Sequence, residues 1–286
     1  MTENLEGKLC LITGATNGIG RSAAIELSKR GAEIAFIARD VEKAQKLFQE
    51  LSVAGGKVME PIIANLGSIE ETKEAAKVFI NRDKDLDILL NNAGIINTER
   101  KETVDGFEEV FAVNHLAYFV LTLCLLNGIK NNPKRIVNVS SGAHAFVKDI
   151  NYQDIEYKEN YSTMKVYGQS KLANILFTKE LSNKLSSKGT TVNCLHPGFV
   201  NTGIGSQNSP TLARVLMTLA KPFSKKSEKG AETSIYLCSS EEVKGVTGEY
   251  FVDCKIKSVT EAAKSDNNAK KLWEISRKMT GVDLNG

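Results

Sequence analysis

A tyrosine and a lysine four residues apart are the pair in this sequence best suited to acid–base chemistry. Tyr167 and Lys171 fall in the helical segment Val166–Leu185, and this spacing places them on one helix face. A free phenol, with a pKa of about 10, is a poor catalyst at neutral pH, but a nearby ammonium favours the phenolate. The pair therefore indicates a general acid or base, although the same spacing is also common in surface pairs without a function.

A glycine-rich turn follows the first apolar run of the chain and precedes a helical segment. Gly14 can make a tight turn, Gly18 lets the backbone approach a pyrophosphate, and Gly20 allows close packing of helix on strand. The helix N-terminus offers N–H groups and a positive dipole end to phosphates. The residues expected at this phosphate site are Gly14, Thr16, Asn17, Gly18, Ile19 and Gly20. No Lys-Ser/Thr pair closes the turn, so it is not a Walker-type loop.

Short apolar runs alternate with longer helical segments, which is typical of a parallel sheet covered by helices on both faces. Near-continuous apolar character is what a strand buried on both faces requires. The predicted strands are 8–13, 33–38, 57–64, 86–91, 135–140, 191–196 and 249–253. The sequence therefore predicts one α/β domain, residues 1–286, with a Rossmann-like, doubly wound sheet of seven parallel strands.

Composition and charge exclude several classes of protein. With 42% hydrophobic and 25% charged residues, the chain is expected to be globular. A net charge of only +3, spread along the chain, argues against nucleic-acid binding. The N-terminus lacks the layout of a signal peptide, and the longest apolar run, Leu116–Leu126, is too short to span a bilayer. Five separated cysteines and three histidines without metal-ligand spacing predict a cytoplasmic protein with no metal site.

Further motifs follow in a fixed order, and together with the glycine turn they resemble the short-chain dehydrogenase/reductase family. They are Asn91-Asn92-Ala93-Gly94, Asn114, Ser140-Ser141, Tyr167-Gly168-Gln169-Ser170-Lys171 and Pro197-Gly198. The resemblance runs from the first strand to about residue 202, and RIVNVSSGAHAF and SKLANILFTKEL are similar to the retinol-dehydrogenase-like branch. It implies an oxidoreductase that transfers a hydride between a nicotinamide cofactor and a carbonyl or alcohol.

This resemblance also implies roles for individual residues. Tyr167 would exchange a proton with the substrate oxygen, and Ser141, rather than Ser140, would hold that oxygen. Asn114 would support a proton-relay water near Lys171. Beyond the glycine turn, the implied cofactor-binding residues are Asn65, Leu66, Asn92, Ala93, Gly94, Asn114, Tyr167, Lys171, Pro197, Gly198, Val200 and Thr202.

The end of the second predicted strand indicates which nicotinamide cofactor is used. An acidic residue there accepts a hydrogen bond from the ribose of NAD(H), whereas a cation suits the 2′-phosphate of NADP(H). Here Ala38 ends the strand and Arg39 follows, and a guanidinium can bind a phosphate through two hydrogen bonds. We therefore predict NADP(H), with Arg39 as the phosphate ligand, while Asp40 keeps NAD(H) as the alternative.

The resemblance divides the domain into a cofactor-binding and catalytic core (7–202), a lid over the substrate (203–230) and a C-terminal part (231–286). Apolar lid residues at helical spacing favour a small or medium apolar substrate, although such a stripe also fits simple core packing. They are Leu212, Val215, Leu216 and Leu219. The nearby cluster of Lys221, Lys225, Lys226 and Lys229 is either a solvated face or a peripheral contact with anionic lipid.

The helix at 162–187 carries more apolar residues than one face needs, so we expect a symmetric homodimer through it and the helix at 106–130.

The rival to an enzyme is a nicotinamide-binding regulator without catalysis. All four catalytic positions are filled in this sequence, so turnover of any carbonyl would exclude that rival.

Overall fold

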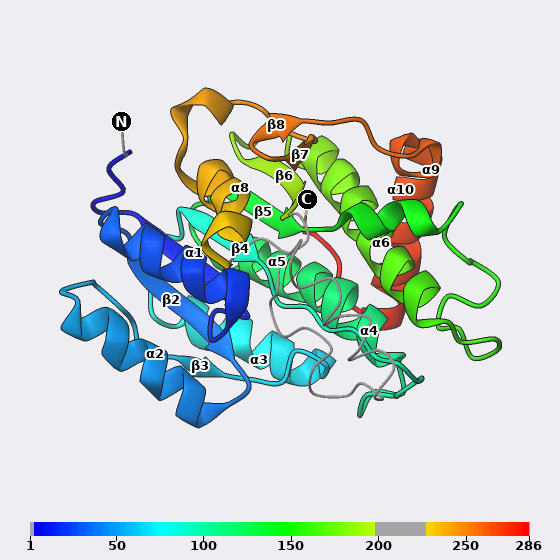
Figure 1. Ribbon diagram of the computed structural model, residues 1–286, viewed down its shortest axis with the longest axis horizontal. Helices are drawn as coiled ribbons and strands as arrows, with labels where there is room; N and C mark the ends of the chain where they lie inside the picture. Colours follow the sequence, from blue (N-terminus) through cyan, green and yellow to red (C-terminus); the bar gives the residue numbers. More distant parts are fainter. Residues whose placement is uncertain (1–2, 198–226, 286) are drawn as a thin grey trace.

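The computed structural model describes residues 3–197 and 227–285. These residues are built around one twisted sheet (Figure 1). Its strand order is β3-β2-β1-β4-β5-β6-β7-β8. The strands are β1 (Leu9–Thr13), β2 (Glu33–Ala38), β3 (Ile62–Ile63), β4 (Ile88–Asn91), β5 (Arg135–Val139), β6 (Thr191–His196), β7 (Tyr250–Val252) and β8 (Lys255–Ile256). The first seven pair in parallel, which confirms the predicted Rossmann-like sheet.

Helices cover both faces of this sheet, and each face has its own apolar core (Figure 1). One layer consists of α1 (Gly18–Lys29), α2 (Val41–Val53) and α8 (Ser227–Ser239). The other consists of α3 (Ile69–Ile80), α5 (Ala117–Gly128), α6 (Thr163–Lys184) and α10 (Asp266–Thr280). Shorter turns are α4 (Glu109–Phe111), the π-helical η1 (Ala112–Leu116), the 3-10 helices η2 (Gly142–Phe146) and η4 (Glu241–Val243), and α9 (Glu261–Lys264).

Local sequence explains why these elements begin where they do. All five side chains of β1 are buried, as expected of a central strand covered on both faces. The helix α1 buries Ile19, Ala23 and Leu27 along one face, and the side chain of Asn17 caps its first turn by accepting from the N–H of Gly18. The apolar face packs α1 against the sheet beside β1, and the cap at Asn17 starts the helix at the carboxyl end of that strand.

Two edges of the sheet differ from the prediction. The predicted strand 57–64 is reduced to Ile62–Ile63 and an isolated bridge at Val58, because Pro61 has no N–H to donate to a neighbouring strand. At the other edge, β8 is an unpredicted eighth strand that pairs antiparallel with β7. The residues that join them, Asp253 and Cys254, both have positive φ, as in a tight hairpin turn.

The apolar residues of α6 that suggested a dimer are buried within one chain. Leu172, Leu176 and Leu181 belong to the core that α6 shares with the sheet, α5 and α10. Trp273 of α10 stacks on Phe177 of α6. A dimer therefore stays a prediction, without the surplus apolar face that was its reason.

One helical stretch, 109–128, is long and apolar enough to cross a membrane by length and composition. It lies in the core, however, with 83% of its most apolar window buried. Among the four lysines of the basic cluster, only Lys229 lies within the described residues, where it pairs with Glu232. The other three lysines and the apolar residues of the predicted lid lie outside the described residues.

Candidate active site

The glycine turn lies at the carboxyl ends of β1 and β4, where the strand order changes direction. Gly14 and Gly18 have φ of 66° and 54°, in the left-handed region that favours glycine. A Cβ on Gly14 would lie 2.8 Å from the Cα of Ala93, and a Cβ on Gly20 would overlap the carbonyl oxygen of Gly14. Only glycines therefore let this turn pack against the loop after β4 and leave room for a phosphate at the N-terminus of α1.

Hydrogen bonds across the sheet hold the turn in this position. The Thr13 hydroxyl accepts from the N–H groups of Asn92 and Ala93, at 2.9 and 3.0 Å. In return, the Asn92 amide donates to the carbonyl oxygens of Thr13 and Gly14. The role of Asn92 is thus to join the turn after β1 to the loop after β4. Sequence analysis missed Thr13, whose only signal was a polar residue at the end of an apolar strand.

A cleft of about 280 Å³ opens from this turn along the carboxyl ends of the strands. Most of the residues predicted to bind cofactor line it. They are Gly14, Thr16, Asn17, Gly18, Ile19, Gly20, Arg39, Asn65, Leu66, Asn92, Ala93, Gly94, Tyr167, Lys171 and Pro197. Asn114 and Ser141 are not among the lining residues, whereas Ser140 is. Gly198, Val200 and Thr202 fall outside the described residues. The loop after β4 contributes further lining residues that the sequence analysis did not identify, including Ile96 and Asn97.

Tyr167 and Lys171 face the cleft from the first turns of α6. The Nζ of Lys171 is 5.6 Å from the centre of the Tyr167 ring and donates to the carbonyl oxygen of Val139, at the end of β5, at 3.2 Å. Ser141 caps η2 by accepting from the N–H of Ala143, and its hydroxyl is close enough to Tyr167 to lower the pKa of the phenol in part. By contrast, the Ser140 hydroxyl is buried and donates to the backbone of α6 at Lys171. Of the two serines, therefore, it is Ser141 whose hydroxyl adjoins the phenol.

Asn114 lies in the π-helical turn η1, a distortion often found at functional sites. Its side chain accepts from the N–H of Ile95 at 2.8 Å, and it donates to the Ile95 carbonyl and the Ser170 hydroxyl at 3.0 Å each. This amide therefore fixes the loop after β4 against α6. A Cβ on Gly94 would lie 3.4 Å from both the Asn114 amide oxygen and the Lys171 ammonium, so glycine keeps that corner open.

Burial shifts the two titratable groups of α6 in opposite directions. It lowers the pKa of Lys171 to about 7, because an ammonium is costly to desolvate. Burial raises the pKa of Tyr167, while the hydrogen bond with Ser141 lowers it in part. The structure thus differs from the expectation that Lys171 lowers the tyrosine pKa. The lysine is itself close to neutral, and its Nζ is directed at Val139 rather than at the phenol oxygen.

At the far end of the cleft, the structure adds a second cation to Arg39. Lys43, in the first turn of α2, lines the cleft together with Arg39 and Asp40. The Asp40 carboxylate caps α2 by accepting from the N–H of Lys43, and it also pairs with the Lys43 ammonium at 2.9 Å. These contacts lower the pKa of Asp40, so it stays ionised. Asp40 is therefore engaged with the helix, which weakens the argument that it serves as a ribose ligand.

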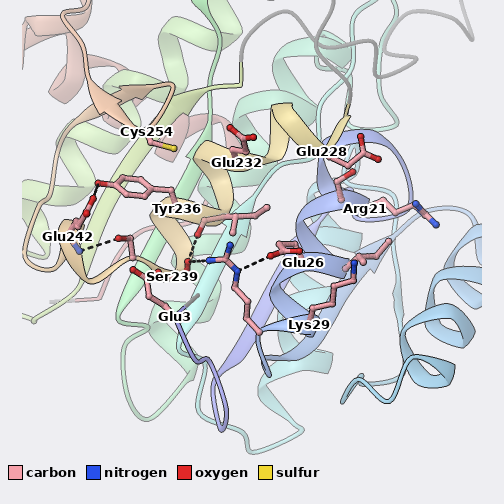
Figure 2. Close-up of a pocket in the computed structure, with 15 residues that line it drawn as sticks. Glu3, Arg21, Glu26, Lys29, Glu228, Glu232, Tyr236, Ser239, Glu242 and Cys254 are labelled. Carbon is pink, nitrogen blue, oxygen red and sulfur yellow. Dashed lines mark hydrogen bonds and ion pairs between the residues drawn. The ribbon is translucent and has the colours of Figure 1, made fainter. Parts of the chain in front are cut away.

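A second cavity, of about 620 Å³, lies between α1 and α8 (Figure 2). Although larger, it contains none of the predicted site residues. Among its charged groups Arg30 pairs with Glu26. The Tyr236 hydroxyl donates to Glu242 (Figure 2). In the part of the chain that is described, no cluster of three or more His, Cys, Asp or Glu could hold a metal ion. The chemistry is therefore placed in the smaller cleft.

Comparison with known proteins agrees with this geometry. The sequence profile of the short chain dehydrogenase family matches residues 8–213. Retinol dehydrogenase 14 of Mus musculus is 40% identical over 294 residues, covering 97% of this chain and 87% of that protein. Retinol dehydrogenase 12 of Homo sapiens is 38% identical over 282 residues, covering 97% and 88%.

Solved structures show the same fold. A protein from Mycobacterium paratuberculosis superposes with a TM-score of 0.79 at 27% identity, covering 99% of this chain and 97% of that one. A short chain dehydrogenase from Burkholderia cenocepacia in complex with NADP superposes with a TM-score of 0.69 at 24% identity, covering 92% and 100%.

The buried lysine leads to a prediction about stability. In the unfolded chain a lysine has its ordinary pKa of 10.5, so below pH 7 folding must desolvate a full charge, and this cost disappears as the pH rises to about 10.5. Lys171→Met removes the charge at similar volume. We expect its Tm near pH 7 to exceed that of the wild type by on the order of 5 °C, and the gain to shrink towards pH 10. Calorimetry of the two cofactor-free proteins across this range is the measurement; a gain that grows with pH would contradict the assignment.

Proposed function

Because this chain belongs to the short-chain dehydrogenase/reductase family, we propose that it interconverts an apolar carbonyl compound and its alcohol with NADP(H) as the coenzyme. The observation that carries this proposal is the meeting of Ser141, Tyr167 and Lys171 beside a cleft that begins at a glycine turn. Similarity to retinol dehydrogenases over nearly the whole chain supports a retinoid-like aldehyde, ketone or alcohol as the substrate class.

The residues present fit a nicotinamide dinucleotide. Gly14 and Gly20 leave backbone where side chains would block a pyrophosphate, and the unpaired N–H groups at the start of α1 suit its charge. Lys171 and Asn92 would hold the nicotinamide end, and Arg39 and Lys43 the adenosine end. When bound, the nicotinamide supplies or accepts a hydride at the substrate carbon.

The protein supplies the proton and positions the substrate oxygen. In the direction of reduction, the Tyr167 phenol donates its proton to the carbonyl oxygen, and the Ser141 hydroxyl donates a hydrogen bond to the same oxygen. A raised pKa keeps Tyr167 protonated before the reaction. Lys171, with a pKa of about 7, exchanges protons at neutral pH and stabilises the phenolate that forms. Asn114 supports both groups by holding the loop after β4 against α6.

An apolar substrate is supported by side chains near the phenol. Phe146, at the end of η2, and Met164, in the first turn of α6, are about half exposed, at 52% and 49%. Phe146 packs close to Gly168, the residue after Tyr167. Large apolar groups left in solvent beside polar catalytic groups are typical of a binding surface for an apolar ligand.

NADP(H) is supported by the pair of cations at the adenosine end. Arg39 lies at the end of β2, and Lys43 is brought to the same part of the cleft by the start of α2. A 2′-phosphate would meet the Arg39 guanidinium and would take the place of Asp40 on the Lys43 ammonium, whereas the ribose hydroxyl of NAD(H) would find a carboxylate already paired with Lys43. Discrimination is therefore shared by two residues rather than carried by Arg39 alone.

The role of the phenol can be tested directly. Tyr167→Phe is expected to lower kcat by about 10² to 10⁴, because the proton donor is lost, while the affinity for the cofactor stays within a few-fold. The matched control is Tyr152→Phe, which removes a phenol that donates to Asn268 away from the cleft and should retain activity. Turnover is measured with a panel of aldehydes, ketones and alcohols. Near-normal rates in Tyr167→Phe would refute the mechanism, and no turnover by the wild type would favour a catalytically silent regulator.

The cofactor preference has its own test. Arg39→Ala and Lys43→Ala should each lower kcat/KM for NADPH by about tenfold, since each removes a charge-assisted contact with the 2′-phosphate, and should leave NADH nearly unchanged. Lys46→Ala, on the exposed side of the same helix, is the control and should change neither. The ratio of kcat/KM for NADPH to that for NADH is compared in all four proteins. An unchanged ratio in both Arg39→Ala and Lys43→Ala would show that neither residue reads the phosphate.

A further inference from the structure

The carbonyl oxygen of Val139, at the end of β5, receives two side-chain hydrogen bonds from α6. One comes from the Lys171 ammonium and the other from the Asn174 amide, each at 3.2 Å. Asn174 is fully buried, and it lies one turn beyond Lys171 on the same helix. The proposed function uses Lys171 but gives no role to Asn174. The shared acceptor links the position of the ammonium to this second side chain.

A histidine lies near the other end of Asn174. His115, the residue after Asn114 in η1, is fully buried, and its Nδ1, like the Oδ1 of Asn174, is buried without a hydrogen-bond partner among the described residues. Its Nε2 lies 2.8 Å from the hydroxyl of Ser276 in α10. Burial lowers the pKa of His115 to about 3, so the ring is neutral and has one N–H donor and one acceptor nitrogen.

The amide of Asn174 therefore has one hydrogen bond. Its nitrogen donates to the Val139 carbonyl, while its oxygen is buried without a partner among the described residues. The Nε2 of His115 and the Ser276 hydroxyl share a separate hydrogen bond, which joins η1 to α10. The contact with Val139 is thus the one that connects Asn174 to the acceptor of Lys171.

We propose that Asn174 is a positioning residue for the catalytic lysine; this rests on the proposed function of Lys171. A lysine ammonium ends a flexible chain of four methylenes, so its location depends on the acceptor that it finds. Asn174 donates to that same acceptor, one turn beyond Lys171 on α6, and so fixes the Val139 carbonyl against the helix. The position of the ammonium therefore depends on a side chain that does not line the cleft.

The test compares two variants that each remove one buried hydrogen bond between α6 and β5. Asn174→Leu removes the bond to Val139, and Thr178→Val removes the bond from Asn138, one turn farther along. Both should lower Tm, because each removes a buried hydrogen bond between α6 and β5. Only Asn174→Leu should lower kcat, by about tenfold, with KM for the carbonyl within about twofold. Equal changes in kcat for the two variants would overturn the proposal.

A double-mutant cycle with Lys171→Met shows whether Asn174 acts through the lysine. In that background Asn174→Leu should have no further effect on kcat or on cofactor affinity, whereas independent effects would multiply and contradict the proposal. If Asn174→Leu does not fold, Asn174→Ala replaces it in the cycle, with the same expected loss in kcat.

Affinity for the nicotinamide cofactor, followed by its fluorescence, is the second readout. Asn174→Leu should weaken it by about fivefold and Thr178→Val by less than twofold, because a displaced Lys171 also loses the nicotinamide end of the cofactor. This readout decides the role of Asn174 even if the wild type turns over no carbonyl, a result that would refute the proposed function alone. Equal affinities in the two variants would overturn the role of Asn174.

Discussion

A lysine charge buried beneath the end of β5 is the constraint on which the site depends. Lys171 is only 3% exposed, and the carbonyl of Val139 is the acceptor that the structure gives its ammonium. Desolvating a cation costs several kcal/mol, so the group is held near its neutral form at physiological pH. That cost has a chemical use, because a base with a pKa of about 7 can exchange protons with Tyr167 under working conditions. Glycine at position 94 leaves the space in which it does so.

The strand order of the sheet determines where the crevice of the site lies. Between β1 and β4 the connections lead away in opposite directions, which opens a crevice at the carboxyl ends of these strands. The glycine turn and the loop after β4 meet in this crevice and are joined by Thr13 and Asn92. The helix α6 then brings the phenol and the ammonium to the neighbouring strand, β5. The glycine turn therefore lies at the ends of β1 and β4, and the phenol and the ammonium lie at the end of the adjacent strand, β5.

Much of the fold and of the candidate site could be predicted from sequence, because each central strand is a continuous apolar run and each motif is local. The seven parallel strands and the glycine turn are examples. What could not be predicted depends on contacts between distant residues. Thr13 acts on a loop 79 residues away, and Lys43 joins Arg39 only after Asp40 has started α2. The strand β8 follows a turn at Asp253 and Cys254 that lacks the usual glycine, and Pro61 shortened β3 inside an apolar run. The lysine pKa likewise reflects burial that no spacing reveals.

The most direct test of the account is the ionisation of Lys171 itself. Lysines labelled with carbon-13 at Cε can be titrated by NMR, and the resonance of Lys171 is assigned by its loss in Lys171→Met. The account predicts that this resonance titrates near pH 7 in the protein without cofactor, well below the ordinary lysine pKa of 10.5. If Lys171 instead titrates above pH 10, the ammonium is not desolvated and the proposed proton exchange with Tyr167 is wrong.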